Sequence, residues 1–512
     1  MSERKPPEAG EWGPLLADLE RRTAEARAMG GAEKLKRQHA GGRLDARARV
    51  VNLLDPGSFT ELGTLVGGVQ AAGARPTPAD ALVAGMGRID GRPVLVGAED
   101  FSVMGGSIGP GAADKRYRLT QLSRQERVPL IMLLEGAGHR MTNLLRPRGR
   151  GPNDLQGLAE LAGLVPTVCC VMGSSAGHGA LTAPLMDFVV MVEGGALFSA
   201  GPPLVEAAMG QRVEKEELGG TAVHVDVSGV AHNRAANDET ALQMVRSYLS
   251  YFPGNAWQAP PRSEGPDTGE RRLDDILELI PVDSRRPYKM RAVVETCFDA
   301  ESVFEVQPSH GKAIITALAR LGGFSVAVVA NDPSERGGAV DANAAVKASR
   351  FLEIVGGFHL PVIFLADNPG VLAGTQAERD GVLRYAARMF VAQHRLRVPK
   401  ISVTLRKAFG FGSSIMAMNP FDGQTLNLAF PGVSLGAMPA RGGGAASKAD
   451  DQVQADLDAH QAGGPYSAAD SMAFDEVIDP RELRNALLQG LDLARGREGA
   501  AREPVNRIGA LP

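Results

Sequence analysis

The chain has 512 residues, which favours two domains over a single core. Its 55 Lys and Arg residues nearly balance its 59 Asp and Glu residues, for a formal net charge of −4 at pH 7. The composition therefore gives no reason to expect nucleic acid or an anionic membrane as a partner. Three cysteines provide neither a disulfide framework nor a zinc ribbon, and we expect a cytoplasmic protein with no metal site.

The first half of the chain alternates between strand and helix patterns, and its many glycines are typical of an α/β protein. The N-terminus, MSERKPPEAG, lacks the apolar core of a signal peptide. Leu15 to Met29 predicts an amphipathic helix, and VVNLLDPGSFTELG predicts a turn before a strand. From Gly91, an apolar strand leads to the Gly105-Gly106 turn, a helix of mixed polarity and a second strand, VPLIMLLEGAG. Crossovers of this kind imply largely parallel pairing.

The segment VPTVCCVMGSSAGHGALTAP, from Val165 to Pro184, allows two interpretations. GSSAG matches G-x-S-x-G, the strand-turn-helix elbow in which Ser175 would be a nucleophile. Alternatively, the glycines matter, and the turn offers backbone N–H groups to a developing negative charge. A hydrolase would also need a histidine and an acid. The candidates, His224, His232 and His310, stand in no recognisable context.

The second half of the chain repeats the plan of the first. Residues 255–275 are rich in Pro and charge and read as a linker. Beyond them, the sequence from Gly323 matches the sequence from Gly91 without a gap, so that Lys347 stands opposite Lys115. We predict an N-terminal domain over 1–260, a linker over 261–285 and a C-terminal domain over 286–512. The predicted elements end with an amphipathic helix that closes near Arg495.

The repeat separates the two interpretations of the serine segment. VPTVCCVMGSSAGHG aligns with VPKISVTLRKAFGFG, so Gly177-His178-Gly179 stands opposite Gly410-Phe411-Gly412. Ser175 stands opposite Ala408, so what repeats is the glycine turn and not the serine. A strand that ends in such a turn and opens a helix leaves N–H groups suited to an oxyanion. The remaining alternative is that the glycines only permit close strand-helix packing.

Seven segments resemble, in order, the carboxyltransferase β subunits of biotin-dependent acyl-CoA carboxylases, the propionyl- and methylcrotonyl-CoA carboxylase group. The resemblance covers roughly residues 40 to 490. The segments are EDFSVMGGSIGPGAADK, VMGSSAGHGALTAP, GPPLVEAAMG, EELGGTAVHVDVSGVAH, RPYKMRAVVE, DNPGVLAGTQAE and VPKISVTLRKAFGFG. Each alone is a weak signal, whereas seven in the same order are highly specific.

The resemblance implies an α/β fold of two crotonase-like domains, each with twisted sheets flanked by helices. It implies an enzyme that moves a carboxyl group from N-carboxybiotin on a separate carrier subunit to the α-carbon, or vinylogous carbon, of an acyl-CoA. The N-terminal domain would serve the acyl-CoA and the C-terminal domain the biotin. The family scheme uses no side-chain base. A biotin carboxylase and carrier subunit would be partners, and the chain would form a homo-hexamer whose active sites span subunits.

The resemblance also assigns site residues. The acyl-CoA enolate oxygen would accept from the N–H groups of Gly177 and His178, and the biotin ureido oxygen from those of Phe411 and Gly412. The positions expected to contact acyl-CoA or biotin are Gly105, Gly106, Lys115, Gly138, Arg140, Gly410 and Ser414. The nearest cations for the CoA phosphates are Lys115, Arg140, Arg146, Arg148 and Arg150. Two alternatives stay open: the RPRGR segment is a solvated loop, and Lys115 shares a structural role with Lys347.

The chain departs from the family pattern at two histidines. His139 stands in EGAGHR where DSGGAR is usual, and His178 stands where a glycine is expected. The two rings would narrow or polarise the acyl end of the site, or else pack outward or against each other. Two other functions stay open. One is a biotin-dependent acyl-CoA decarboxylase of the same fold. The other is a non-enzymatic scaffold that lost activity through His139, His178 and Phe411.

Overall fold

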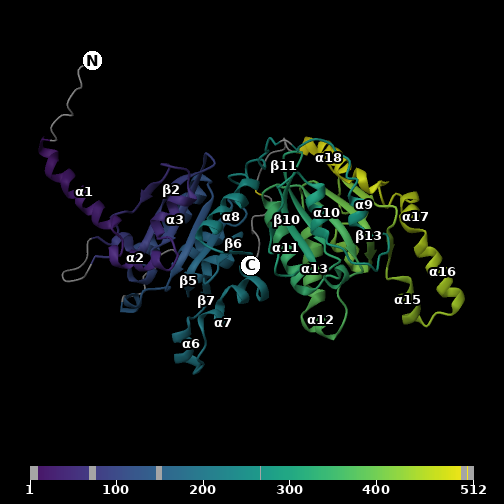
Figure 1. The fold of residues 1–512 in the computed structure, drawn as a ribbon, viewed down its shortest axis with the longest axis horizontal. Helices are drawn as coiled ribbons and strands as arrows, with labels where there is room; N and C mark the ends of the chain where they lie inside the picture. The colour runs from purple at the N-terminus through teal and green to yellow at the C-terminus, as the bar shows by residue number, and fades with distance from the viewer. Residues whose placement is uncertain (1–9, 69–75, 146–152, 266, 498–503, 505–512) are drawn as a thin grey trace, which may run out of the picture. The chain divides into compact units, whose positions relative to one another are not determined.

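The computed structural model describes residues 10–68, 76–145, 153–265, 267–497 and 504. The chain forms two compact units. Unit 1 contains Met1–Leu161, Thr167–His224 and Arg234–Arg246, and unit 2 contains Ala162–Pro166, Val225–Asn233 and Ser247–Pro512. Each unit is built on one eight-stranded sheet with helices packed against it (Figure 1). The chain passes between the units more than once, and the domain limits expected from the sequence stay a prediction.

Unit 1 has the strand order β1-β2-β3-β4-β5-β6-β8, with β7 paired to β5. The β1–β2 and β2–β3 pairs are antiparallel, and β3 to β6 run parallel, as the crossover helices require. The strands are β1 (Thr60–Leu62), β2 (Leu82–Ile89), β3 (Arg92–Glu99), β4 (Leu130–Gly136), β5 (Thr167–Ala176), β6 (Phe188–Val192), β7 (Ala196–Phe198) and β8 (Asn233–Ala235). The helices are α1 (Gly13–Arg27), α2 (Ala32–Ala40), α3 (Ala46–Leu53), α4 (Pro110–Glu126), α5 (Asp154–Leu161), α6 (Pro202–Met209), α7 (Lys215–Gly219) and α8 (Asp238–Tyr251).

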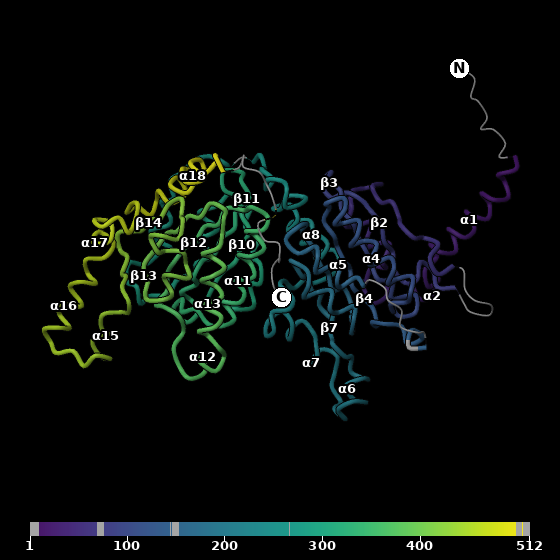
Figure 2. The backbone as a smooth tube through the Cα atoms, turned by 180° about the vertical axis from the view of Figure 1, so that it is seen from behind, coloured from purple at the N-terminus to yellow at the C-terminus, as the bar shows by residue number. Residues whose placement is uncertain are grey.

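Unit 2 has the strand order β16-β14-β13-β12-β11-β10-β9, with β15 paired to β13. Its helices α11 and α13 pack against each other beside the sheet, and α15 and α16 lie out at the edge of the unit (Figure 2). The strands are β9 (Phe304–Val306), β10 (Ile314–Leu321), β11 (Phe324–Asn331), β12 (Val362–Asn368), β13 (Lys400–Phe409), β14 (Leu426–Ala429), β15 (Ser434–Gly436) and β16 (Glu476–Val477). The helices are α9 (Ile276–Leu279), α10 (Met290–Cys297), α11 (Ala342–Gly357), α12 (Thr375–Arg379), α13 (Val382–His394), α14 (Gly410–Ile415), α15 (Ala440–Ser447), α16 (Asp451–Ala462), α17 (Gly464–Asp470) and α18 (Leu483–Leu493).

The two sheets share one connectivity and one register, which confirms the predicted repeat and the α/β fold class. Leu95 pairs with Leu130 in unit 1, and the residues 232 positions later, Ala327 and Val362, pair in unit 2. The β4–β5 and β12–β13 pairs both shift register near the ends of their strands. The segment predicted as a linker belongs to unit 2, where the Ser263 N–H donates to the Gly323 carbonyl at 2.8 Å.

Buried ion pairs fasten the helices of unit 1 to its strand ends. The fully buried Arg49 on α3 donates through Nη1 to Glu135 Oε2 on β4 at 2.5 Å and through Nε to Asp238 Oδ2 on α8 at 2.8 Å. Arg43 donates to the other oxygen of Glu135 at 2.9 Å. Because β4 ends at the position where the site begins, this network sets the position of that edge.

Replacing Arg49 with Met should destabilise unit 1, because Asp238 and one oxygen of Glu135 would stay buried without their cation. Breaking a buried pair on one side costs about 3–5 kcal/mol. We expect a lower urea midpoint by far-UV circular dichroism. Arg21→Met is the matched control: Arg21 pairs with Asp18 and Glu25 on exposed α1, and its loss should change stability by less than about 1 kcal/mol. Equal midpoints for the two variants would contradict the assigned role of Arg49.

Candidate functional site

The N-terminal turn follows β5, whose apolar residues are buried on both faces as expected for a central parallel strand. Gly177 has φ of +55°, a left-handed conformation that favours glycine. Its N–H donates to the Phe198 carbonyl on β7 at 2.9 Å. The next two N–H groups, of His178 and Gly179, have no hydrogen-bond partner among the described residues. The predicted donor role of Gly177 therefore needs correction: Gly177 shapes the turn, and His178 and Gly179 present the unpaired N–H groups.

The C-terminal turn in unit 2 has the same backbone design. Gly410 has φ of +53° and opens α14 directly after β13. The N–H groups of Phe411 and Gly412, in the first turn of this helix, have no hydrogen-bond partner within the described part of the chain. A Cβ at Gly412 would lie 2.0 Å from Asn368 Oδ1, so only glycine fits there without a shift. The Phe411 ring is half exposed and lies 5.6 Å from the Phe390 ring.

Ser414 is another position that the resemblance predicted to contact acyl-CoA or biotin. Its hydroxyl donates to Asn419 Oδ1 at 3.3 Å, and its carbonyl accepts from Gln393 Nε2 at 3.0 Å. These bonds fasten α14 to the segment after it and to α13. Ser414 therefore helps to hold α14, which carries the turn, in position.

Gly105, Gly106 and Gly138 hold the start of α4 against the end of β4. The Gly105 carbonyl accepts from Ala137 N–H at 3.0 Å, and the Gly138 carbonyl accepts from Ile108 N–H at 2.7 Å. A Cβ at Gly106 would lie 2.2 Å from the Glu135 carbonyl oxygen. A Cβ at Gly138 would lie 2.6 Å from the Ala176 carbonyl oxygen, whereas at Gly105 nothing lies within 4 Å and only its φ of +64° favours glycine. The expected contact of these glycines with acyl-CoA or biotin stays a prediction.

The two described cations predicted to bind phosphate are committed to protein partners. Lys115 Nζ, buried beneath α4, donates to the carbonyls of Ala79 and Leu82, and burial lowers its pKa to about 8. Its repeat partner Lys347 likewise donates to two carbonyls, and burial lowers its pKa to about 7. Arg140 pairs with Asp80 at 2.7 Å. The structure thus favours the shared structural role of Lys115.

Residues Arg146, Arg148 and Arg150, the other predicted phosphate ligands, lie outside the described residues. Sequence reasoning missed Arg118, an exposed guanidinium three residues after Lys115 on α4 with no ion-pair partner among the described residues. The i, i+3 spacing was the available signal, because it places both side chains on one helix face.

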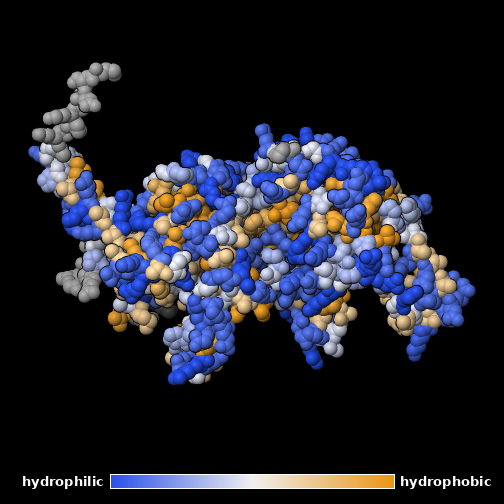
Figure 3. All heavy atoms as spheres, in the orientation of Figure 1, coloured by the Kyte–Doolittle hydropathy of each residue, from blue (hydrophilic) through white to orange (hydrophobic). Residues whose placement is uncertain are grey.

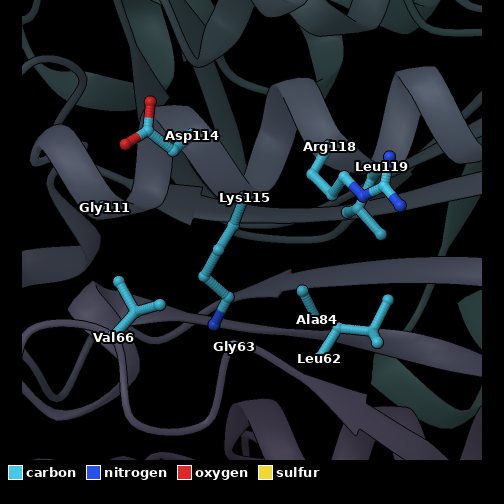
Figure 4. A pocket seen from close by; sticks show the side chains of 9 residues that line it. All are labelled: Leu62, Gly63, Val66, Ala84, Gly111, Asp114, Lys115, Arg118 and Leu119. Atoms are coloured by element: carbon cyan, nitrogen blue, oxygen red, sulfur yellow. The ribbon is translucent and has the colours of Figure 1, made fainter.

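Arg118 lies at a pocket of about 250 Å³ between α4 and the β1–β2 edge. Figure 4 shows the Lys115 side chain reaching from α4 toward Gly63, with Arg118 at the side of the pocket. The lining residues are Leu62, Gly63, Val66, Ala84, Gly111, Asp114, Lys115, Arg118 and Leu119. The pocket thus offers apolar walls beside the guanidinium of Arg118, a combination that suits an amphiphilic anion.

His139 and His178 pack against each other, as one of the sequence alternatives stated. Their ring centroids lie 4.6 Å apart in an edge-to-face arrangement. His178 Nε2 lies 2.5 Å from Asp154 Oδ1 at the start of α5. Arg116 on α4 donates through Nε to Asp154 Oδ2 at 2.7 Å and through Nη1 to Glu99 at 2.9 Å. His178 in the turn is therefore connected, through Asp154 and Arg116, to Glu99 by a series of buried hydrogen bonds between charged groups.

Burial and the neighbouring side chains shift the pKa of the Asp154 carboxyl in opposite directions. Burial raises the pKa of the Asp154 carboxyl, but the hydrogen bond from His178 and the charge of Arg116 outweigh it and hold that pKa below its ordinary value. Burial, with the neighbouring His178, lowers the pKa of His139. Asp154 and Arg116 were missed from the sequence because no local pattern links them to the turn 24 and 62 residues away.

Ser175 has none of the surroundings of a nucleophile. It is fully buried, and its hydroxyl has no hydrogen-bond partner among the described residues. The nearby His178 faces Asp154, and His224 lies 2.9 Å from the Leu197 carbonyl. A hydrolytic triad needs a base hydrogen-bonded to the serine, so the geometry rejects the hydrolase interpretation.

The described residues contain neither a cluster of metal ligands nor a membrane-spanning helix. No group of three or more His, Cys, Asp or Glu residues there is placed to hold a metal ion. Likewise, none of the helices in the described ranges combines the length and the apolar character that crossing a bilayer requires.

Comparisons with known proteins show which family has this fold and sequence. The carboxyl transferase domain family matches residues 37–504. The propionyl-CoA carboxylase carboxyltransferase subunit of Haloferax mediterranei is 32% identical, covering 97% of this chain and 99% of its own. The methylmalonyl-CoA decarboxylase subunit alpha of Veillonella parvula is 33% identical, covering 94% and 96%. The hexameric transcarboxylase 12S structure with methylmalonyl-CoA bound superposes with a TM-score of 0.90 at 30% identity, covering 99% and 100%. This match confirms the predicted crotonase-like fold.

The lowered pKa values of Lys115 and Lys347 predict a pH-dependent stability. Each folded-state pKa lies below the ordinary value of 10.5, so the unfolded chain binds more protons between the two values and stability rises with pH across that window. Lys115→Met and Lys347→Met should each flatten the rise in urea midpoint between pH 7 and about 10. Lys36→Met, on the exposed face of α2, is the control. An unchanged slope in Lys115→Met would mean that its ammonium titrates as an exposed lysine does.

Proposed function

Because the chain belongs to the carboxyl transferase domain family, we propose that it moves a carboxyl group between biotin on a partner subunit and the α-carbon of an acyl-CoA. It is the carboxyltransferase component of a biotin-dependent acyl-CoA enzyme. One observation carries this proposal: the chain presents, within its described residues, two separate pairs of unpaired N–H groups, His178 with Gly179 in unit 1 and Phe411 with Gly412 in unit 2.

Carboxyl transfer develops negative charge on one carbonyl oxygen of each reactant, and two preorganised pairs of donors answer that need. The His178 and Gly179 N–H groups hold the thioester oxygen as it becomes an enolate. The Phe411 and Gly412 N–H groups hold the ureido oxygen, and Gly412 lets the first turn of α14 pack directly against Asn368 at the end of β12. Biotin, when bound, supplies the nitrogen that carries the carboxyl group. The chain's own residues position the two oxygens.

Arg118 is the described cation best placed for an anionic part of the substrate, because Lys115 and Arg140 are committed to protein partners. Its guanidinium suits a phosphate of CoA. The pocket beside it accepts apolar atoms of the same ligand.

A biotin carboxylase and a biotin carrier subunit are the proposed partners, and the proposed assembly is a homo-hexamer of this chain in the cytoplasm. The similar transcarboxylase 12S core assembles as a hexamer. Helix α1 exposes the apolar side chains of Leu15, Leu16 and Leu19, and Trp12 directly before it is also exposed. Orange and tan atoms lie along this helix in Figure 3. Exposed apolar surface of this kind is typical of an interface with another chain.

The reverse direction is the second candidate function. The relative from Veillonella parvula is named as a decarboxylase subunit and is 33% identical to this chain, against 32% for the relative named as a carboxylase subunit. The same pairs of donors serve both directions, since each reaction passes through the same enolate.

The proposed function is tested with free biotin and methylmalonyl-CoA as probes. We expect the purified chain to accelerate the loss of the carboxyl group from methylmalonyl-CoA when biotin is added, measured as release of CO₂ and formation of propionyl-CoA. Malonyl-CoA in place of methylmalonyl-CoA reports on the acyl preference. A chain that binds neither CoA ester, or whose rate does not respond to biotin, would contradict the proposal.

Replacing Gly412 with Val should abolish most of this activity, and Ser175→Ala should retain it. A side chain at Gly412 collides with Asn368 and displaces the N–H groups beside it, and the loss of one oxyanion donor costs about 3–4 kcal/mol in the barrier. Ser175 lies behind the turn and donates to no described group. The two variants are compared by biotin-dependent turnover, with circular dichroism to verify folding. Activity lost in Ser175→Ala and kept in Gly412→Val would reverse the assignment.

A further inference from the structure

One imidazole nitrogen of His178 is hydrogen-bonded to Asp154, and the other has no hydrogen-bond partner among the described residues. Nε2 lies 2.5 Å from Asp154 Oδ1, and Arg116 holds the second carboxylate oxygen at 2.7 Å. Nδ1 has no hydrogen-bond partner in the described part of the chain. The pKa of Asp154 is held low, so its carboxylate accepts this hydrogen bond, the Nε2 atom carries a proton, and Nδ1 is the ring nitrogen left without a described partner. This is the arrangement by which a carboxylate orients a histidine for proton transfer.

His178 holds this imidazole at the oxyanion turn itself. Its own backbone N–H and that of Gly179 are the two donors of the turn that stay unpaired among the described residues. The side chain keeps 14% of its surface exposed, so the ring is packed without being sealed. His139 contacts the ring edge to face and limits its rotation. A base, its orienting acid and the oxyanion donors thus meet within one turn and its neighbours.

The charged and titratable groups that face His178 come from three elements. They are Asp154 on α5, His139 after β4, and Arg116 on α4 behind Asp154. His139 Nδ1 lies 3.4 Å from Asn143 Nδ2. No other cation touches the imidazole among the described residues, so a proton taken by Nδ1 is stabilised by Asp154.

We infer that His178, oriented by Asp154, is a general acid-base that removes and returns the α-proton of an acyl-CoA at this turn in the absence of biotin. The inference rests on the proposed function for the position of the thioester. The α-C–H bond breaks, its electron pair forms the enolate held by the two N–H groups, and the proton moves to Nδ1. The reverse step returns a proton from the imidazolium to the α-carbon. The net reaction is exchange of the α-hydrogen with solvent, with no oxidant, reductant or second substrate.

Exchange is measured with propionyl-CoA in D₂O, using the full chain purified away from biotinylated proteins on avidin. Mass spectrometry follows deuterium at the α-carbon. We expect exchange well above the buffer rate in the wild type. His178→Gln keeps a donor for Asp154 without a base, and it should lower the exchange rate by about 100-fold or more. His39→Ala is the matched control: His39 lies 2.9 Å from Asp45 on an exposed surface, and its loss should leave exchange unchanged.

Asp154 is a positioning residue, and its variant separates orientation from binding. Asp154→Asn should slow exchange while the affinity for propionyl-CoA, measured by calorimetry, stays near that of the wild type. A merely structural role would lower affinity and rate together.

Three results would overturn the inference: no exchange in the wild type, exchange retained in His178→Gln, or equal losses in His178→Gln and His39→Ala. Biotin-dependent carboxyl loss without exchange would remove this inference and leave the proposed function standing. A chain with neither activity and no affinity for propionyl-CoA would remove both.

Discussion

The Glu99 carboxylate at the end of β3 accepts a hydrogen bond from the backbone of the neighbouring strand β4, and the rest of the site depends on this bond. Glu99 accepts from the Glu135 N–H at 2.8 Å, at the position where β4 and β5 lose their regular register. Two buried carboxylates at one sheet edge are tolerated only when cations compensate them. Arg116 forms an ion pair with Glu99, and Arg49 forms one with Glu135. These arginines come from α4 and α3, so the charge requirement also fixes the helices that surround the turn.

Unit 2 has the equivalent hydrogen bond, but its acceptor is a side-chain amide instead of a carboxylate. Asn331 stands where unit 1 has Glu99, and its Oδ1 accepts from the Asp367 N–H at 3.1 Å. A neutral amide needs no cation, and the position of Arg116 is occupied by the buried Ala348. The backbone plan therefore repeats without the Glu99–Arg116 pair, whereas Asp367, at the position of Glu135, is again paired with a buried arginine, Arg406, at 2.8 Å. What repeats serves the shared requirement for oxyanion donors, and what differs distinguishes the turn proposed for the acyl-CoA from the turn proposed for biotin.

The sequence was sufficient for features that follow from backbone rules. The repeat, the strand that ends at Gly177 and the helix expected over Leu15 to Met29, observed as α1 (Gly13–Arg27), all follow from local pattern. It was insufficient where distant segments meet. The bond from Gly177 N–H to Phe198 depends on β7, a strand of three residues. Asp154 reaches His178 only because α5 packs beside the turn. No local sequence pattern predicts such long-range pairings.

His178 illustrates why a backbone-based site can change its side chains. An oxyanion donor is a peptide N–H, so the residue that carries it is free to vary as long as the turn keeps its shape. The strain of the turn falls on Gly177, whose positive φ leaves the next residue in an ordinary conformation. A β-carbon at His178 is therefore accommodated, and Asp154, already present to balance Arg116, becomes a partner for its imidazole. Side-chain chemistry is thus added to this turn at no cost to the backbone donors that define it.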